Sequence, residues 1–262
     1  MVQKEANEKV NPSFSSWDDE HGLLYDYTEN RFPVKLYNHT KKDAKFICEE
    51  SNVGHFIYVQ TGEYSIATNN RKPINITDGM FASVGEKFTF TQHTEGQAIQ
   101  IKIYNENPFF YVGGPIEKEG RLKYIDGCTD SLLISPTKLG LSCLNHLHFP
   151  KEIDQTMHTH PSMRVGIVAK GSGNCITPFG DIELYTGQVF IIHEETGNIH
   201  KGLDGKMHLE GSHCFQTFEG EMDVIAFHPD SDYGPQDEEH PMINRTIVDG
   251  ISAKYIDEIR TQ

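Results

Sequence analysis

The chain has few basic residues and no long apolar run. Its 262 residues include 23 Lys and Arg against 38 Asp and Glu, for a formal net charge of −15. A field of that sign repels phosphate backbones and anionic membrane surfaces, so neither nucleic acid nor a membrane is an expected partner. No apolar stretch approaches the ~20 residues of a membrane span, and the polar segment Met1 to Glu20 does not read as a signal peptide.

The sequence also has few cysteines and few of the motifs of common enzyme classes. Its five cysteines are odd in number and form no CxxC pair, which favours reduced, mostly buried thiols in a cytoplasmic protein. A glycine-rich phosphate loop and a Gly-x-Ser-x-Gly elbow are both missing. The histidines are therefore the main candidates for a functional site.

Long segments with helical spacing are missing as well. Residues 1–33 are polar and turn-rich, which predicts an arm that packs on the surface. From about Val34 the pattern is that of short strands separated by glycine-rich turns, as in Gln97–Tyr104, where isoleucine falls at every second position. This pattern predicts an all-β sandwich or barrel. In the tail, Ile251, Tyr255 and Ile259 stand four apart and predict a short helix laid on the barrel.

The two halves of the strand-rich region repeat each other. Tyr58–Glu63 parallels Ile167–Ser172, which puts Gly62 and Gly171 109 residues apart (171 − 62 = 109). This period is too long for a solenoid and about the size of one small barrel domain. We therefore infer an ancient duplication.

One histidine pattern carries the chemistry. His158 and His160 are two residues apart, so in a strand their imidazoles lie on one face and can reach the same point. His200 follows after a turn and a further strand and can complete a three-nitrogen set. Imidazole suits iron, nickel, copper and zinc, so the pattern predicts a transition-metal site.

These residues resemble the motifs of the cupin superfamily. The usual first motif, His-x-His, three or four residues, Glu, six residues and Gly, is matched here from His158 to Gly171, with Arg164 in place of the glutamate. In the second motif Gly187 is followed after five residues by His193 where proline is usual, and the Gly-x2-His end is Gly197 to His200, with two extra residues in the turn.

The resemblance implies a bicupin with two tandem cupin barrels (double-stranded β-helix, or jelly-roll) and a short C-terminal helix. The implied divisions are an N-terminal arm (1–33), a degenerate barrel (34–112), a connector (113–133), a metal-binding barrel (134–230) and a C-terminal tail with its helix (231–262). In the first barrel the positions of His158 and His160 are taken by Glu49 and Ser51, and the nearest histidine to the third ligand position is His93. The first barrel is thus expected to be structural and free of metal. His55 takes the place of Arg164 there, so a degenerate second pocket in the first barrel stays as an alternative.

The resemblance also implies roles for individual residues. His158, His160 and His200 would hold a divalent metal, with Fe(II) favoured and zinc, manganese, nickel and copper as alternatives. Arg164 points into the barrel by strand parity and needs an anion. That anion is either an acid such as Glu194 or Glu195, or a substrate carboxylate or phosphate gripped bidentately. His193 and Glu195 are candidates for a fourth ligand or a general acid/base, or belong to a solvated loop.

Other residues are weaker candidates. His146 and His148 share a face of one strand and either line the same cavity or are hydrogen-bonded core residues. His213 and His228 lie on late strands, and the sequence does not fix whether their side chains face inward. Gln155 and Met157 lie at the entry to the motif. Aromatic side chains are candidate pocket walls or plain core: Tyr185, Phe190, Phe215 and Phe227.

Three functions remain open at this point. Three-histidine cupin centres resemble the iron(II) sites of thiol, diketone and gentisate-type dioxygenases, so an oxidoreductase acting on a small carboxylated molecule is the first hypothesis. The second is a redox-silent metal-dependent isomerase, epimerase, lyase or hydrolase. The third is a non-catalytic ligand-binding or storage bicupin. A small anionic substrate is the expected partner, and a homodimer formed through exposed sheet edges is expected.

Overall fold

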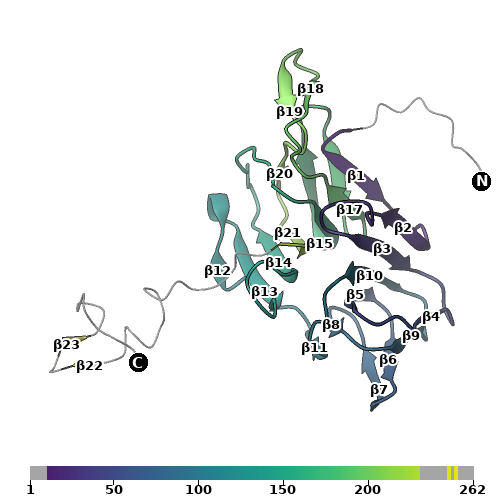
Figure 1. The fold of residues 1–262 in the computed structure, drawn as a ribbon. Helices are drawn as coiled ribbons and strands as arrows, with labels where there is room; N and C mark the ends of the chain where they lie inside the picture. Colours follow the sequence, from purple (N-terminus) through teal and green to yellow (C-terminus); the bar gives the residue numbers. More distant parts are fainter. Residues whose placement is uncertain (1–10, 231–246, 249–250, 253–262) are drawn as a thin grey trace, which may run out of the picture.

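The regular structure of the chain is almost entirely antiparallel β (Figure 1). The computed structural model describes residues 11–230, 247–248 and 251–252. Among these residues the only helical element is a 3-10 turn, Ile125–Gly127, and no helix is long and apolar enough to cross a membrane. All five cysteines are free and buried, as the sequence predicts.

A six-stranded sheet and a four-stranded sheet are formed by the first part of the chain. The six-stranded sheet has the order β11 (Tyr111–Gly113), β8 (Phe81–Val84), β5 (Val53–Thr61), β10 (Gln97–Tyr104), β3 (Val34–His39), β2 (Gly22–Asp26). The four-stranded sheet has the order β4 (Lys45–Cys48), β9 (Phe88–Gln92), β6 (Tyr64–Thr68), β7 (Arg71–Ile76).

A nine-stranded sheet is formed mainly by the second part of the chain. Seven strands have the order β1 (Phe14–Trp17), β17 (Val189–Ile192), β15 (Arg164–Ile176), β21 (Met222–His228), β14 (Cys143–Phe149), β13 (Thr129–Ile134), β12 (Leu122–Lys123). Off this path, the far half of β15 pairs with β16 (Ile182–Tyr185) and β20 (Cys214–Gln216). Two hairpins stand apart, formed by β18 (Ile199–Lys201) with β19 (Met207–Leu209), and by β22 (Ile247–Val248) with β23 (Ile251–Ser252).

The strand order supports the duplication inferred from sequence. β8-β5-β10-β3 in one sheet has the same arrangement as β17-β15-β21-β14 in the other. His55 pairs with Val84 as Arg164 pairs with Ile192, so these two residues occupy equivalent places 109 positions apart (164 − 55 = 109). Gly62 and Gly171 both have positive φ, and a Cβ on Gly171 would lie only 1.9 Å from the carbonyl oxygen of Glu221. Only glycine fits this bend without displacement of backbone.

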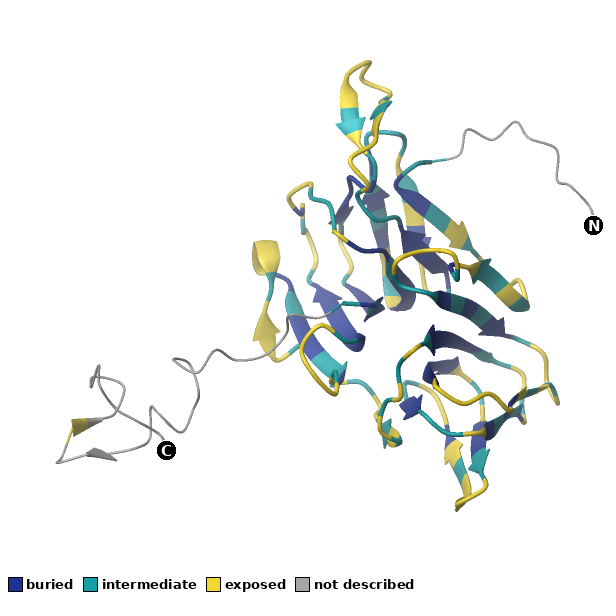
Figure 2. Ribbon diagram, in the orientation of Figure 1, coloured by how far each residue is buried: buried dark blue, intermediate teal, exposed yellow. Residues whose placement is uncertain are grey.

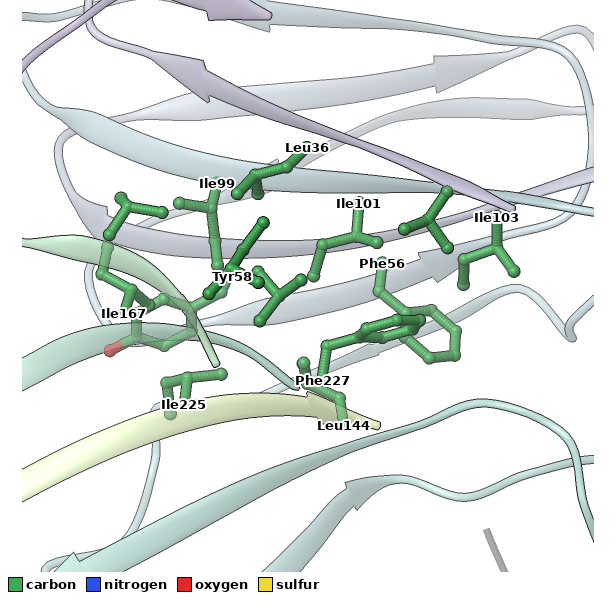
Figure 3. Close-up of a cluster of buried hydrophobic side chains, with 14 of the residues drawn as sticks. Leu36, Phe56, Tyr58, Ile99, Ile101, Ile103, Leu144, Ile167, Ile225 and Phe227 are labelled. Atoms are coloured by element: carbon green, nitrogen blue, oxygen red, sulfur yellow. The ribbon is translucent and has the colours of Figure 1, made fainter. Parts of the chain in front are cut away.

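The central strands are buried on both faces because they contribute to two cores (Figure 2). Along β5, Phe56 and Tyr58 face the other large sheet, while Ile57 and Val59 face the four-stranded sheet. The same alternation in β21 places Ile225 and Phe227 in the core between the two large sheets. Val224 and Ala226 lie in a separate core of the second part of the chain, called the second core below. Figure 3 shows the shared core between the two large sheets, where side chains from both meet: Leu36, Phe56, Tyr58, Ile99, Ile101, Ile103, Leu144, Ile167, Ile225 and Phe227.

The ends of the chain differ from the expectation. The arm does not merely cover the surface, because β1 extends the sheet edge at β17 and Phe14 is buried in the second core. The expected connector 113–133 contains β12 and most of β13, so the boundary at 134 falls inside a strand. The helix expected from Ile251 begins at a residue that lies in β23, and its remaining residues lie outside the described ranges.

Candidate metal centre

Three histidine rings meet at one end of the second core. His158, His160 and His213 each offer a ring nitrogen, and these three atoms lie within 4.8 Å of one another. The ring centroids are 4.5 Å apart for His158 and His213, 5.0 Å for His158 and His160, and 5.1 Å for His160 and His213. No other such group of three or more His, Cys, Asp or Glu was found within the described residues.

Backbone pairing holds two of these histidines in place. His158 lies in the segment that leads into β15, His213 directly precedes β20, and the two form an isolated antiparallel bridge. Each ring donates a hydrogen bond from Nδ1 to a carbonyl two residues earlier, His158 to Thr156 at 2.7 Å and His213 to Gly211 at 2.8 Å. A carbonyl can only accept, so both rings carry a proton on Nδ1, and the neutral form of such a ring has its lone pair on Nε2.

Burial favours the uncharged form of two of these rings. Desolvation is the main cause that lowers the pKa of His160 to about 2, and the nearby Arg164 cation lowers it further. Desolvation likewise lowers the pKa of His213 to about 3. The buried Nε2 of His213 has no hydrogen-bond partner within the described residues. Neutral imidazoles with free lone pairs are what a metal ion requires.

The histidines form part of the wall of a small cavity of about 30 Å³. Part of its lining is apolar: Leu147, Phe149, Phe190, Phe215, Val224 and Ala226. The polar residues of the lining are Tyr124, Gln155, Arg164 and His228 together with the three histidines. Phe190, Phe215 and Gln155 thus lie where the sequence analysis placed them as candidates.

Arg164 points into this cavity with one edge of its guanidinium engaged. Its Nη1 donates hydrogen bonds to Asp230 at 3.1 Å, to the carbonyl of Met163 at 3.2 Å, and to the carbonyl and hydroxyl oxygens of Ser162. The acid that pairs with Arg164 is therefore Asp230, not Glu194 or Glu195. Nε and Nη2 have no hydrogen-bond partner among the described residues, and Nε is buried.

The structure does not bring His200 to the other two predicted ligands. His200 lies in β18, opposite His208 in β19, and its ring packs edge-on against Phe179. Figure 1 shows this hairpin projecting from the end of the nine-stranded sheet. The Gly-x2-His spacing pointed to His200, but the segment between β17 and β20 contains this hairpin, and His213, beyond the hairpin, is the residue that lies beside His158 and His160.

The two candidates for acid/base chemistry also turn away from the cavity. His193 faces the N-terminal strand, with Nε2 2.9 Å from the Ser15 hydroxyl, and burial lowers its pKa. Glu195 accepts a hydrogen bond from the Thr159 hydroxyl at 2.7 Å, and its amide donates to the carbonyl of His160 at 2.8 Å. Glu195 therefore holds the segment of Thr159 and His160 in place, and neither Glu195 nor His193 lines the cavity.

Several other candidates belong to the structural core. His146 and His148 do not line the cavity, because both donate a hydrogen bond to Asp223 Oδ1, at 2.8 and 2.9 Å. Phe227 faces the core between the sheets. Met157 and Tyr185 are exposed. In the first part of the chain, interior polar residues bond one another in a chain from His39 through Gln100 and His55 to Cys48.

The residues present fit a transition metal. Three imidazoles whose nitrogens lie within 4.8 Å of one another, with the buried Nε2 of His213 unpartnered within the described residues, are a donor set that iron, zinc, nickel and copper accept. The Nδ1 hydrogen bonds to backbone carbonyls fix the tautomer and orientation of two of the rings, as such bonds do around bound metals. His213 was not among the predicted ligands, because its distance from the first motif exceeds the family spacing.

Comparison with known proteins identifies the fold. No protein-family model and no curated protein matches the sequence. Among solved structures, protein Ylba from E. coli has a TM-score of 0.58 at 12% identity, covering 89% of this chain and 97% of its own. A cupin 2 conserved barrel domain protein from Leptotrichia buccalis has a TM-score of 0.54 at 12% identity, covering 87% and 91%. Salicylate 1,2-dioxygenase from Pseudoaminobacter salicylatoxidans, solved with gentisate, has a TM-score of 0.57 at 8% identity, covering 84% and 82%. The chain therefore has the fold of the cupin-domain proteins.

Proposed function

We propose that the protein is a metal-dependent bicupin enzyme acting on a small carboxylated molecule, with its metal site in the second barrel only. The observation that carries the proposal is the convergence of two features on one cavity. Three histidines line it with their ring nitrogens close together, and Arg164, whose Nε has no hydrogen-bond partner within the described residues, lines it as well. A metal ligand set beside a fixed cation suits a chelating anion.

Arg164 would bind and orient the substrate. Asp230 and the carbonyls of Ser162 and Met163 hold Nη1, so the guanidinium is fixed before a ligand enters. The free Nε–Nη2 edge has the geometry for two parallel hydrogen bonds to a carboxylate. The ion pair with Asp230 and the anion-binding role, weighed as alternatives from the sequence, are thus compatible because they use different edges.

The metal would be held by His158, His160 and His213, and Fe(II) is the favoured ion. When bound, it would supply a Lewis acid and a redox centre. With O2 as the co-substrate, the reaction proposed is a dioxygenation in which both oxygen atoms enter the product. The similarity of the fold to a salicylate 1,2-dioxygenase supports this reaction class. The protein's own contribution is to orient the substrate on Arg164 and to exclude water with the apolar residues of the cavity lining.

A redox-silent isomerase, lyase or hydrolase is the second candidate. His228 favours it, because this imidazole lines the cavity. Burial, with a smaller effect of Arg164, lowers its pKa to about 3, so the ring is neutral and can donate one hydrogen bond and accept another from a polar substrate. His193 and Glu195 do not support this role, since neither lines the cavity.

Metal analysis and oxygen consumption test these proposals in turn. Protein purified without a histidine tag and reconstituted under anaerobic conditions should contain close to one transition-metal ion per chain. The His158→Ala variant should not retain that ion. Absence of bound metal after reconstitution would refute both enzyme proposals and favour a binding protein. Oxygen uptake with a panel of small carboxylated substrates then separates the dioxygenase from the redox-silent enzyme.

A further inference from the structure

Two acidic side chains are almost fully buried within the described residues, and their surroundings differ. Asp223 in β21 is 3% exposed, and one of its oxygens accepts hydrogen bonds from both His146 and His148. Asp130 in β13 is 5% exposed and accepts a single side-chain hydrogen bond, from Asn145 Nδ2 to Oδ2 at 3.0 Å. A buried carboxylate needs several donors or a cation to stay ionised. Asp223 has such donors, whereas Asp130 has one neutral amide.

The pair formed by Asp130 and Asn145 lacks one hydrogen. Oδ1 of Asp130 and Oδ1 of Asn145 are both buried, and neither has a hydrogen-bond partner within the described residues. Buried polar atoms are nearly always hydrogen-bonded, so two unsatisfied acceptors on residues that already contact each other call for a shared explanation.

A single proton on Oδ1 of Asp130 satisfies both atoms. A protonated carboxyl group has one O–H donor and keeps its acceptor capacity on the other oxygen. Asp130 would then donate from Oδ1 to the amide oxygen of Asn145, while its Oδ2 accepts the bond from Asn145 Nδ2 that the structure already contains. The result is a neutral pair of an acid and an amide joined by two parallel hydrogen bonds.

The electrostatic surroundings favour the neutral acid. Burial raises the pKa of Asp130 to about 6 from the ordinary 3.8, and outweighs the hydrogen bond from Asn145 and the nearby His146, which lower it. The other titratable neighbours are Tyr124 and Cys143. Burial raises the pKa of each, and the charge of an ionised Asp130 raises both further.

Asp130 lies on the same face of the sheet as part of the cavity lining. It stands directly opposite Leu147 in the ladder between β13 and β14, so the two side chains share a face, and Leu147 lines the cavity. Tyr124, whose pKa responds to the charges of Asp130 and Arg164, lines the cavity as well. The protonation of Asp130 therefore changes the charge close to this lining.

We infer that Asp130 and Asn145 form a pH-sensitive switch in the nine-stranded sheet, closed by a proton that Asp130 holds and shares with Asn145. When the proton leaves for solvent, a negative charge remains near Tyr124, so the charge around the cavity depends on pH. The folded pKa of Asp130 lies above the ordinary value, so the pair contributes stability in acid that is lost as the pH rises through about 6. The inference does not depend on the proposed function, since it requires neither metal nor substrate.

Infrared spectroscopy of the metal-free protein tests the protonation directly. At pH 5 the wild-type spectrum should contain the carbonyl stretch of a buried carboxylic acid, which fades as the pH rises through about 6. Asp130→Asn should lack this band, and Asp223→Asn, the matched control in the same sheet, should retain it. Absence of the band from the wild-type protein, or its persistence in Asp130→Asn, overturns the inference.

The dependence of stability on pH gives a second readout. An asparagine at position 130 can donate to the amide oxygen of Asn145 at every pH, so it imitates the closed switch. Between pH 8 and pH 5, the ratio of folded to unfolded protein in urea should rise about 10-fold more for the wild-type protein than for Asp130→Asn. Parallel profiles overturn the inference. If Asp130→Asn does not fold, the band is compared in Asn145→Ala, where loss of the amide partner should shift its frequency and an unshifted band contradicts the pairing.

Discussion

His158 and His213 exchange both of their backbone hydrogen bonds, with N···O distances of 2.9 and 3.0 Å. This pairing joins the segment before β15 to the start of β20 and brings the two rings to a centroid distance of 4.5 Å. The position of His213 is therefore set by sheet pairing, and its Nε2 is left free by the bond from Nδ1 to Gly211. The first prediction follows from this arrangement.

His213→Ala should lower metal affinity by at least about 100-fold, since even loss of a group that only orients a ligand costs about 10- to 100-fold. His200→Ala is the matched control and should leave the affinity unchanged, because His200 packs against Phe179 in the hairpin. Competition with a chromogenic chelator measures both. Loss of metal in the His200 variant with retention in the His213 variant would restore the assignment made from sequence spacing.

Arg164→Met should raise KM for an anionic substrate by about 10- to 100-fold, which corresponds to the loss of a charge-assisted hydrogen bond of about 1.5–3 kcal/mol. Metal content should stay the same. Asp230→Asn is the informative control, because it removes the ion pair at Nη1 and leaves the Nε–Nη2 edge available. If the Asp230 variant showed the larger rise in KM, the role of Arg164 would be structural.

The metal-free protein should lose stability in mild acid because buried histidines must take up protons when the chain unfolds. Burial, aided by Arg164, lowers the pKa of His228 to about 3, against 6.5 for the free side chain. A group with a lowered histidine pKa contributes its full stability above about pH 6.5 and loses it as the pH falls toward 3. At pH 5 the loss for one such histidine is about 2 kcal/mol.

Urea unfolding at pH 7, 6 and 5 with a chelator present measures this effect. His228→Leu should flatten the dependence of the unfolding free energy on pH. Between pH 7 and pH 5, the wild-type protein should lose about 2 kcal/mol more of this free energy than the variant does. Parallel curves for the wild-type protein and the variant would show that His228 is not held neutral.

Gly166→Ala should destabilise the protein by about 1–3 kcal/mol, as added methyl groups do in a packed core. The new methyl would meet the Phe190 ring at 2.3 Å and force it toward the cavity. Gly220→Ala adds the same methyl where nothing lies within 4 Å and should have little effect. Thermal unfolding compares them, and an unchanged Tm for Gly166→Ala would mean that Phe190 can move freely.

Asp223→Ala should cost about 3 kcal/mol, since it leaves the buried donors of His146 and His148 without an acceptor. Although burial disfavours its charge, the hydrogen bonds from these two histidines lower the pKa of Asp223 overall. Asp204→Ala provides the comparison, because Asp204 bonds His208 on the exposed hairpin. Equal effects of the two substitutions on the free energy of unfolding would argue against a structural role for the buried carboxylate.

The sequence predicted the β architecture because alternation within short strands is a local property. The isoleucines of β10 do face one core, as their period of two requires. The repeat also could be predicted, since Gly62 and Gly171 mark equivalent bends. The role of β1 could not, because its four residues carry no signal that they pair with β17 across the molecule.

The site was half predictable for a similar reason. His158 and His160 belong to one local motif, whereas His213 depends on pairing between distant segments. The family spacing selected His200, and no local property of Gly197–His200 reveals that it opens a hairpin. Strand alternation predicted that Arg164 points into the barrel, and its side chain does line the cavity. Its partner Asp230 follows β21, and only tertiary structure brings the two residues together.

The core between the two large sheets makes the two parts of the chain depend on each other for stability. Apolar side chains from both sheets bury one another there, as Phe56 and Phe227 do with ring centroids 5.9 Å apart. Removal of either part would therefore expose the apolar face of the other to water. A truncated chain that kept only one large sheet would carry an uncovered hydrophobic surface and would be expected to aggregate.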